Sequence, residues 1–176
     1  MISPSDLTIT SLNQMSQEQF GESLGAIYED TPEVADQAWR SHPFLDISHL
    51  HQAMAMIVLN MSDAEQLHLI CAHPDLGSKF KMAEASVLEQ STIGLDQLSA
   101  VEFHQFQELN QAYKDKFKFP FIIAVRNHTK DSILKSFKQR LQNTIEVEQK
   151  QAIAEINEIA RWRLILAINL GRQKNP

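Results

Sequence analysis

The chain of 176 residues is 43% hydrophobic and carries a formal net charge of −6 at pH 7. These values fit one globular domain with a core of its own and exclude a disordered chain. The sequence contains no block of Lys and Arg, so an acidic protein without a nucleic-acid partner is expected. The one cysteine, Cys71, excludes an intrachain disulfide, and we expect it to be a small buried residue rather than a nucleophile.

Targeting and membrane signals are also missing from the sequence. Its first residues show no signal-peptide pattern, and its most apolar run, residues 164–170, is too short to span a bilayer. We therefore expect a cytoplasmic protein with no membrane partner. A single domain is expected over residues 1–176, with residues 1–15 as a looser N-terminal segment, because no linker, repeat or low-complexity stretch divides the chain.

Helix signals dominate the first sixty residues. Residues 16–19 (Ser-Gln-Glu-Gln) form a capping box that predicts a helix over residues 17–28. Thr31 followed by proline is typical of an N-cap and a first helical position, which predicts a short helix to residue 40. A third helix is expected over residues 47–61, which are rich in Ala and Met.

Two more capping boxes mark the middle of the chain. Residues 62–65 (Ser-Asp-Ala-Glu) begin a helix that Pro74 ends, because the residue before a proline disfavours the α conformation. A short helix is expected over residues 84–91. Residues 99–102 (Ser-Ala-Val-Glu) begin an amphipathic helix, whose apolar stripe consists of Phe103, Phe106, Leu109, Tyr113 and Phe117.

The last third combines one extended segment with two helices. Residues 119–125 are apolar and expected to be extended, and helices are predicted over residues 131–143 and 144–170. Beyond Trp162 the last helix is apolar on several faces, which indicates deep burial or a dimer contact. Together the elements predict an all-α fold of about seven or eight helices.

Four positions could carry chemistry. His73 stands at the end of a helix, where the partial negative charge favours a protonated ring suited to proton transfer, although it could instead only cap the helix. Ser86, Glu89 and Gln90 share a helix face that could orient a small polar ring or simply be solvated. Arg126 follows a buried segment and could bind a carboxylate or carbonyl, or form a structural salt bridge.

The fourth position, the turn at residues 42–44 (His-Pro-Phe), could wall a pocket or only connect two helices. A metal is not expected, because Glu65 and His68 have the spacing of a helical di-iron motif but the sequence lacks its second copy. No nucleotide-binding or nucleophile-elbow motif occurs, so no cofactor is expected either.

Taken in order, these segments resemble the 2-oxo-4-hydroxy-4-carboxy-5-ureidoimidazoline (OHCU) decarboxylase family over roughly residues 17–165. The stretches that carry the resemblance are residues 24–29 (LGAIYE), 42–44 (HPF), 69–77 (LICAHPDLG), 86–91 (SVLEQS), 94–96 (GLD), 109–113 (LNQAY), 116–126 (KFKFPFIIAVR) and 140–143 (RLQN). Each stretch alone is a weak signal, and their order and spacing make the resemblance specific.

The resemblance implies an all-α, usually dimeric protein that converts OHCU to S-allantoin and CO2 without cofactor or metal. It implies that His73 is the catalytic histidine and Glu89 the active-site glutamate. The residues that it implies for substrate binding are Phe44, Pro74, Ser86, Gln90, Ile122, Ala124 and Arg126. The chain departs from the family pattern at His42, Lys118 and Asn127, where arginine, glycine and glycine are usual.

Two other function classes compete with this interpretation. His73, Pro74 and Asp75 form the tripeptide of J-domain co-chaperones, but the preceding residues 63–72 hold two acids and no Lys or Arg, unlike the basic helix of those domains. A related helical module that serves only as a binding scaffold is the second alternative. Retention of the histidine, the glutamate and Arg126 together favours the enzyme.

Overall fold

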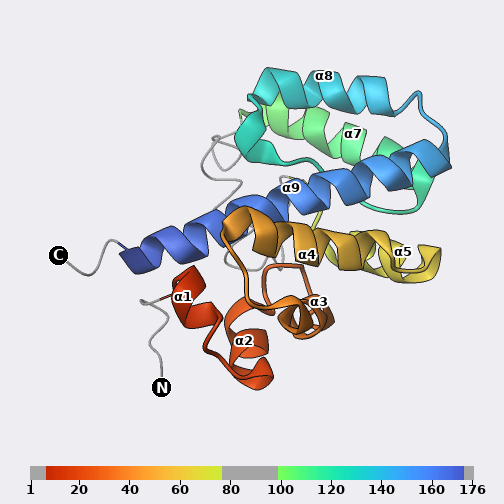
Figure 1. The fold of residues 1–176 in the computed structure, drawn as a ribbon. Coiled ribbons are helices and arrows are strands. Elements are labelled where there is room, and N and C mark those ends of the chain that lie inside the picture. Colours follow the sequence, from red (N-terminus) through yellow and green to blue (C-terminus); the bar gives the residue numbers. More distant parts are fainter. Residues whose placement is uncertain (1–6, 77–98, 173–176) are drawn as a thin grey trace. The chain divides into compact units, whose positions relative to one another are not determined.

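The computed structural model describes residues 7–76 and 99–172, and over these residues the protein consists of helices and connecting segments (Figure 1). These residues contain eight α-helices and no strand. The α-helices are α1 Ile9–Leu12, α2 Gln17–Leu24, α3 Glu33–Ala38, α4 Ile47–Leu59, α5 Asp63–Ala72, α7 Ala100–Phe117, α8 Lys130–Arg140 and α9 Ile145–Arg172, and the 3₁₀ turns are η2 Trp39–Ser41 and η4 Val125–Asn127. The predicted all-α fold is confirmed.

The chain divides into two compact units. Unit 1 comprises Met1–Leu69 and Asn157–Pro176, and unit 2 comprises Ile70–Ile156. Helix α9 therefore contributes its N-terminal part to unit 2 and its C-terminal part to unit 1.

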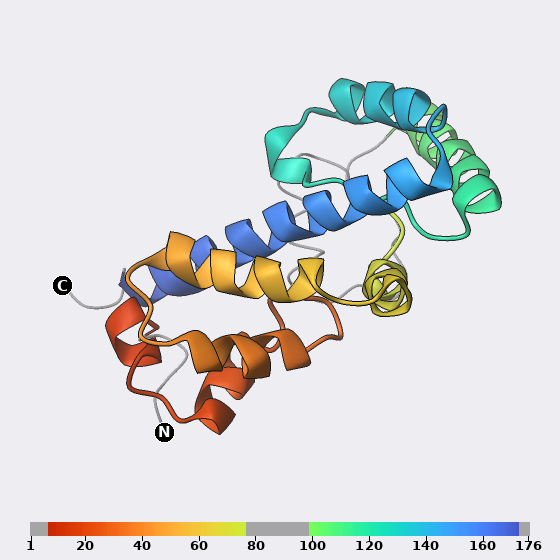
Figure 2. The ribbon, with the colours of Figure 1, turned by 45° about the vertical axis from the view of Figure 1, so that its right-hand side comes forward.

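Unit 1 is built around the C-terminal part of α9. Both views show α4 lying along this part of the helix (Figures 1 and 2), and His51 Nε2 lies 2.8 Å from the Asn157 carbonyl oxygen. The buried Tyr28 hydroxyl donates to Asn157 Oδ1 at 2.7 Å, and burial raises the pKa of this phenol. Arg163 forms a buried ion pair with Glu29, with Nη2 2.9 Å from Oε2. A charge pair therefore fixes α9 to the turn after α2.

Unit 2 has an aromatic core between α7, α8 and the segment that joins them. The rings of Phe121 and Phe137 stack with centroids 3.6 Å apart, and Tyr113 meets Phe121 edge-on at 5.1 Å. Phe117 packs against Tyr113 at 4.5 Å, and all four side chains are buried. The predicted apolar stripe of residues 103–117 thus forms the core through Phe106, Tyr113 and Phe117, whereas Phe103 is exposed.

Three helices, α2, α5 and α7, begin where the sequence predicts a capping box. Ser16 and Ser99 form capping boxes with Gln19 and Glu102. In α5 the Ser62 hydroxyl accepts from Glu65 N–H, and the Glu65 carboxylate accepts from Ser62 N–H. Such caps satisfy N–H groups that have no partner inside the helix. Glu102 also binds Lys130 at the start of α8, and these hydrogen bonds lower its pKa to about 2.

The structure corrects several predicted boundaries in the first half of the chain. The helix expected over residues 17–28 ends at Leu24, with Gly25 as its C-cap, because glycine weakens helix propagation. Thr31 does not cap α3, since its hydroxyl donates to the Glu29 carbonyl and Pro32 occupies the N-cap position without a side-chain bond. Helix α1, capped by Thr8, was not predicted.

In the second half, residues 119–124 form an irregular segment, which continues into η4 rather than a strand. The helix predicted over residues 84–91 lies outside the described residues. The last two predicted helices are confirmed as α8 and α9, with ends shifted by a few residues. Within the described residues, no helix is long and apolar enough to cross a bilayer.

Gly25 is a position where a side chain would disturb the turn after α2. A Cβ built there would lie 2.7 Å from the Gly21 carbonyl oxygen and 3.2 Å from Pro32 Cβ. At Gly21 the nearest atom is the movable carboxylate of Asp36. We predict that Gly25→Ala lowers the free energy of unfolding by about 1–3 kcal/mol, because it overpacks against backbone. Urea unfolding measures this, with Gly21→Ala as the matched control; equal losses in both variants would contradict the prediction.

Candidate active site

His73 lies directly after α5 and is only 7% exposed. Its backbone N–H donates to the Ile70 carbonyl at 3.2 Å, which closes the last turn before Pro74. Helix α7 holds the residues that follow. Asn110 Nδ2 donates to the Leu76 carbonyl at 2.7 Å, and Lys114 Nζ pairs with Asp75 at 2.9 Å. The loop that carries the predicted catalytic histidine is thus fixed from two directions.

Arg126 occupies the middle of η4, Val125–Asn127, at the end of a buried segment. Its side chain is half-buried, whereas residues 119–125 are all apolar and buried. Apart from the proline, they are core residues that are 5% exposed or less: Phe119, Phe121, Ile122, Ile123, Ala124 and Val125. Arg126 thus directly follows a buried apolar segment, as the sequence predicts. Such a group can bind a carboxylate or a carbonyl oxygen through two N–H donors.

The backbone of this segment is bound by side chains from two helices. Arg140 Nη1 donates to the Ile122 carbonyl at 2.7 Å, and the Ala124 N–H donates to Glu155 Oε2 at 2.8 Å. Irregular buried backbone needs such partners, because it has no helix or sheet ladder to satisfy it. Arg140 and Glu155 therefore set the path of the chain just before Arg126.

Arg140 is itself held by a buried carboxylate, Glu148, which is 0% exposed. The guanidinium lies over the Phe121 ring and contacts Glu148 through Nε at 3.0 Å and Nη2 at 2.9 Å. Asn143 Nδ2 donates to Glu148 Oε1 at 2.7 Å, and the Tyr113 hydroxyl donates to Oε2. Burial, followed by the bond to Glu148, raises the pKa of Tyr113. The carboxylate is thus surrounded by donors.

The network around Glu148 is not evident from the sequence. Arg140 and Asn143 fall in one of the stretches that carry the family resemblance, and Tyr113 falls in another. Only the structure shows that these stretches meet at Glu148. A buried acid cannot be recognised from sequence, since its partners are distant along the chain.

Most of the predicted site residues that the structure describes belong to unit 2: His73, Pro74, Ile122, Ala124 and Arg126. Phe44 belongs to unit 1, where it is 2% exposed and stacks on Phe20. Its backbone forms two hydrogen bonds with the Asn13 side chain, at 2.7 and 2.8 Å. Ser86, Glu89 and Gln90 lie outside the described residues.

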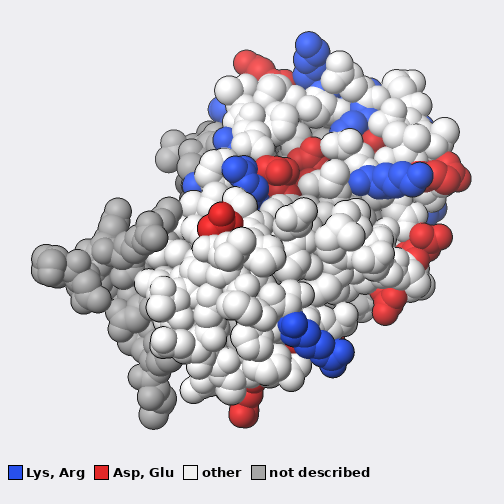
Figure 3. All heavy atoms as spheres, in the orientation of Figure 1, with Lys and Arg blue, Asp and Glu red and all other residues white. Residues whose placement is uncertain are grey.

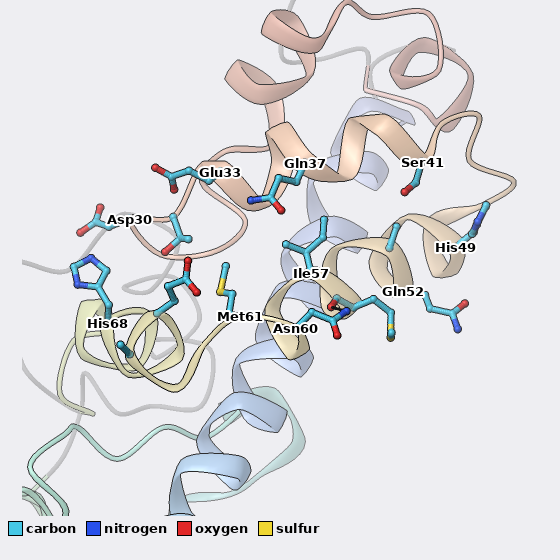
Figure 4. Close-up of a pocket in the computed structure, with 15 residues that line it drawn as sticks. Asp30, Glu33, Gln37, Ser41, His49, Gln52, Ile57, Asn60, Met61 and His68 are labelled. Atoms are coloured by element: carbon cyan, nitrogen blue, oxygen red, sulfur yellow. Dashed lines mark hydrogen bonds between the residues drawn. The ribbon is translucent and has the colours of Figure 1, made fainter.

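Unit 1 contains a groove of about 1170 Å³ that the sequence analysis did not predict (Figure 4). Asp30 and His68 lie toward one end and Ser41, His49 and Gln52 toward the other. The lining residues are Asp30, Thr31, Glu33, Gln37, Ser41, His49, Gln52, Ala53, Met56, Ile57, Asn60, Met61, Ala64, Glu65 and His68. None of the site residues predicted from the sequence belongs to this lining.

The groove combines acidic side chains with apolar ones. Glu65, which lines it, is engaged in the α5 capping box, and its bonds to Ser62 lower its pKa. Within residues 7–76 and 99–172 no group of three or more His, Cys, Asp and Glu side chains is placed to bind a metal ion. Cys71 is exposed, so the expectation that it is buried was wrong; partial burial nevertheless raises the pKa of its thiol.

Charged side chains are distributed unevenly over the surface of the protein. Figure 3 shows Lys, Arg, Asp and Glu side chains gathered over α7, α8 and the N-terminal part of α9 on this face. The surface around α4 carries few charges in the same view, in agreement with the exposed Met56 and Leu59.

Comparison with known proteins identifies the family of this chain. The model of the OHCU decarboxylase family matches residues 13–165. The chain belongs to this family. The match includes His73 and Arg126, two of the family-implied residues that belong to unit 2.

Individual members show the same similarity. An OHCU decarboxylase of Halalkalicoccus jeotgali is 41% identical over 158 residues, which cover 90% of both chains. A protein of Bacillus sp. named uric acid degradation bifunctional protein is 42% identical over 90% of this chain, which spans 32% of that protein. The crystal structure of an (S)-allantoin synthase superposes with a TM-score of 0.74 at 33% identity, over 92% of this chain and 54% of that one.

The network around Glu148 predicts a pH-dependent effect of Tyr113→Phe. At pH 7 the variant should lose about 1–3 kcal/mol of unfolding free energy, because a buried carboxylate loses one donor. An unfolded tyrosine ionises near pH 10.0, whereas the raised pKa keeps folded Tyr113 neutral, so the wild type loses stability as pH rises above that value. The difference in unfolding free energy between wild type and Tyr113→Phe should therefore become smaller above pH 10.0. Urea unfolding at pH 7 and at alkaline pH tests this, and a constant difference would contradict it.

Proposed function

We propose that this protein is a carboxy-lyase that converts OHCU to S-allantoin and CO2 in uric acid degradation. The observation that carries this proposal is the family match over residues 13–165, together with the buried His73 and the nearby fixed loop. The names of the relatives, OHCU decarboxylase, (S)-allantoin synthase and uric acid degradation protein, support the same reaction.

The chemistry of the substrate explains why amino-acid side chains suffice. The carboxylate is attached to a ring carbon that also carries a hydroxyl and adjoins a carbon–nitrogen double bond. When the bond to the carboxylate breaks, CO2 leaves, the electron pair forms a carbon–carbon double bond in the ring, and the nitrogen of the former carbon–nitrogen double bond takes up a proton from solvent. The hydroxyl then loses its proton and becomes a carbonyl, while the carbon that bears the ureido group gains a proton. The substrate is its own electron sink, so the protein must supply positioning and one stereospecific proton transfer.

His73 is the proposed proton-transfer residue, either as the base for the ring hydroxyl or as the donor to the new carbon centre. Burial of the imidazole and the fixed loop after it would keep the proton transfer away from water. Glu89 is proposed to orient the hydroxyl and to adjust the basicity of His73. General acid–base groups of this kind contribute about 10²–10⁴-fold to a rate.

The remaining predicted residues are proposed to bind the substrate. Arg126 would hold a carboxylate or carbonyl oxygen through two donors, and Ser86 and Gln90 would bind ring and ureido amides. Within unit 2 the proposed pocket walls are the partly exposed Pro74 and the buried Ile122 and Ala124.

We also propose that the protein is a cytoplasmic homodimer. The support for the dimer is the family resemblance and the apolar C-terminal part of α9, where Trp162, Ile165 and Leu166 are only half-buried. The unpaired Cys71 agrees with a reducing compartment. Sedimentation analysis would show whether the protein has the mass of one or of two chains.

The proposed function predicts faster formation of optically active allantoin from freshly generated OHCU. Circular dichroism follows the product with and without the protein, because the uncatalysed decay gives a racemate. Wild-type protein should produce S-allantoin rapidly, and His73→Ala should lower kcat by about 10²–10⁴-fold with the fold intact. Racemic product at the uncatalysed rate, from folded wild-type protein, would overturn the function. Near-wild-type turnover by His73→Ala would overturn only the assignment of His73.

A further inference from the structure

We propose that Glu155 is a positioning residue for catalysis: its carboxylate holds the Ala124 N–H and thereby fixes the backbone that presents Arg126. This inference rests on the proposed function for the role of Arg126. The contact itself lies within unit 2 and joins α9 to the irregular segment before η4.

The buried segment has two backbone contacts to side chains, and they lie close to Arg126 in the sequence. The Ile122 carbonyl accepts from Arg140 at 2.7 Å, and the Ala124 N–H donates to Glu155 at 2.8 Å. Ala124 also precedes η4 directly, and its carbonyl accepts from Asn127 N–H at 3.0 Å to close that turn. Glu155 therefore binds the N–H of Ala124, the residue whose carbonyl begins the turn that contains Arg126.

Glu155 is itself held in place. Its second carboxylate oxygen accepts from Gln151 Nε2 at 2.9 Å, one helical turn earlier on α9. The two oxygens thus have separate partners, which restricts the rotation of the carboxylate. A charged acceptor gives a stronger hydrogen bond to a backbone N–H than a neutral one does.

Arg140 anchors the same segment but suits a test less well. Its removal would leave the fully buried Glu148 without its cation, which commonly costs several kcal/mol and threatens folding. Glu155 is only half-buried, so a variant there can remove one backbone contact and leave the core intact. Glu158, on the same helix, provides the matched control, because its carboxylate pairs with Arg161 on the surface.

The experiment compares wild type with Glu155→Ala, Glu155→Gln and Glu158→Ala. Hydrogen exchange of the amides in residues 121–127 reports the order of the segment, and initial rates with OHCU give kcat and KM. Glu155→Ala should speed exchange in this segment and raise KM so that kcat/KM falls about 10- to 100-fold, with a small change in Tm. Glu155→Gln keeps an acceptor oxygen, so its amide exchange in residues 121–127 and its kcat/KM should both lie close to the wild-type values. Glu158→Ala should resemble wild type in both measurements.

A second measurement asks whether Glu155 acts through Arg126. In an Arg126→Gln background, adding Glu155→Ala should change kcat/KM less than about twofold, because the group that it positions is already lost. Unchanged exchange and KM in Glu155→Ala, or full additivity of the two substitutions, would overturn the inference. If wild-type protein does not act on OHCU, the proposed function fails. Hydrogen exchange would then still decide whether Glu155 holds the segment.

Discussion

The buried carboxylate of Glu148 is the constraint on which unit 2 depends. A carboxylate without solvent is stable only where donors and a cation replace its water, and here Arg140, Asn143 and Tyr113 do so. These donors come from α7, α8 and the turn before α9, so the charge specifies how three helices meet. Arg140 then extends the network to the Ile122 carbonyl. The arginine that neutralises the buried Glu148 therefore also fixes the path of the segment before Arg126.

Unit 1 is also held together by a buried ion pair. In unit 2 helix α9 supplies the acid, whereas in unit 1 it supplies the cation, Arg163, and the acid, Glu29, comes from the turn after α2. The Arg163 guanidinium also donates to the Ile27 carbonyl at 3.2 Å. In both units a buried arginine thus binds one carboxylate and one backbone carbonyl. Arginine suits this task because its planar group presents several donors in fixed directions.

The sequence predicted what depends on neighbouring residues and missed what depends on distant ones. Capping boxes at Ser16, Ser62 and Ser99 placed three helix starts correctly, because a cap is decided within four residues. Two local features were missed nevertheless: α2 ends before Gly25, and the Thr31 hydroxyl bonds the Glu29 carbonyl instead of capping α3. The positions of His73 and Arg126 were expected from motifs, whereas Glu148 and Glu155 emerged only from the structure. Apart from Asn143 and Gln151, their partners lie 8 to 35 residues away along the chain.

Lys118 ends α7 in the left-handed conformation, with φ 66° and ψ 18°. The family pattern has glycine there, and the structure shows that lysine makes the same turn at a conformational cost of roughly 1–2 kcal/mol. The backbone, rather than the side chain, is therefore what natural selection must preserve at this position. Asparagine, whose codons differ from those of lysine only at the third base, also tolerates this conformation. Valine, isoleucine and threonine do not, so evolutionary drift at this site should stay among a few residue types.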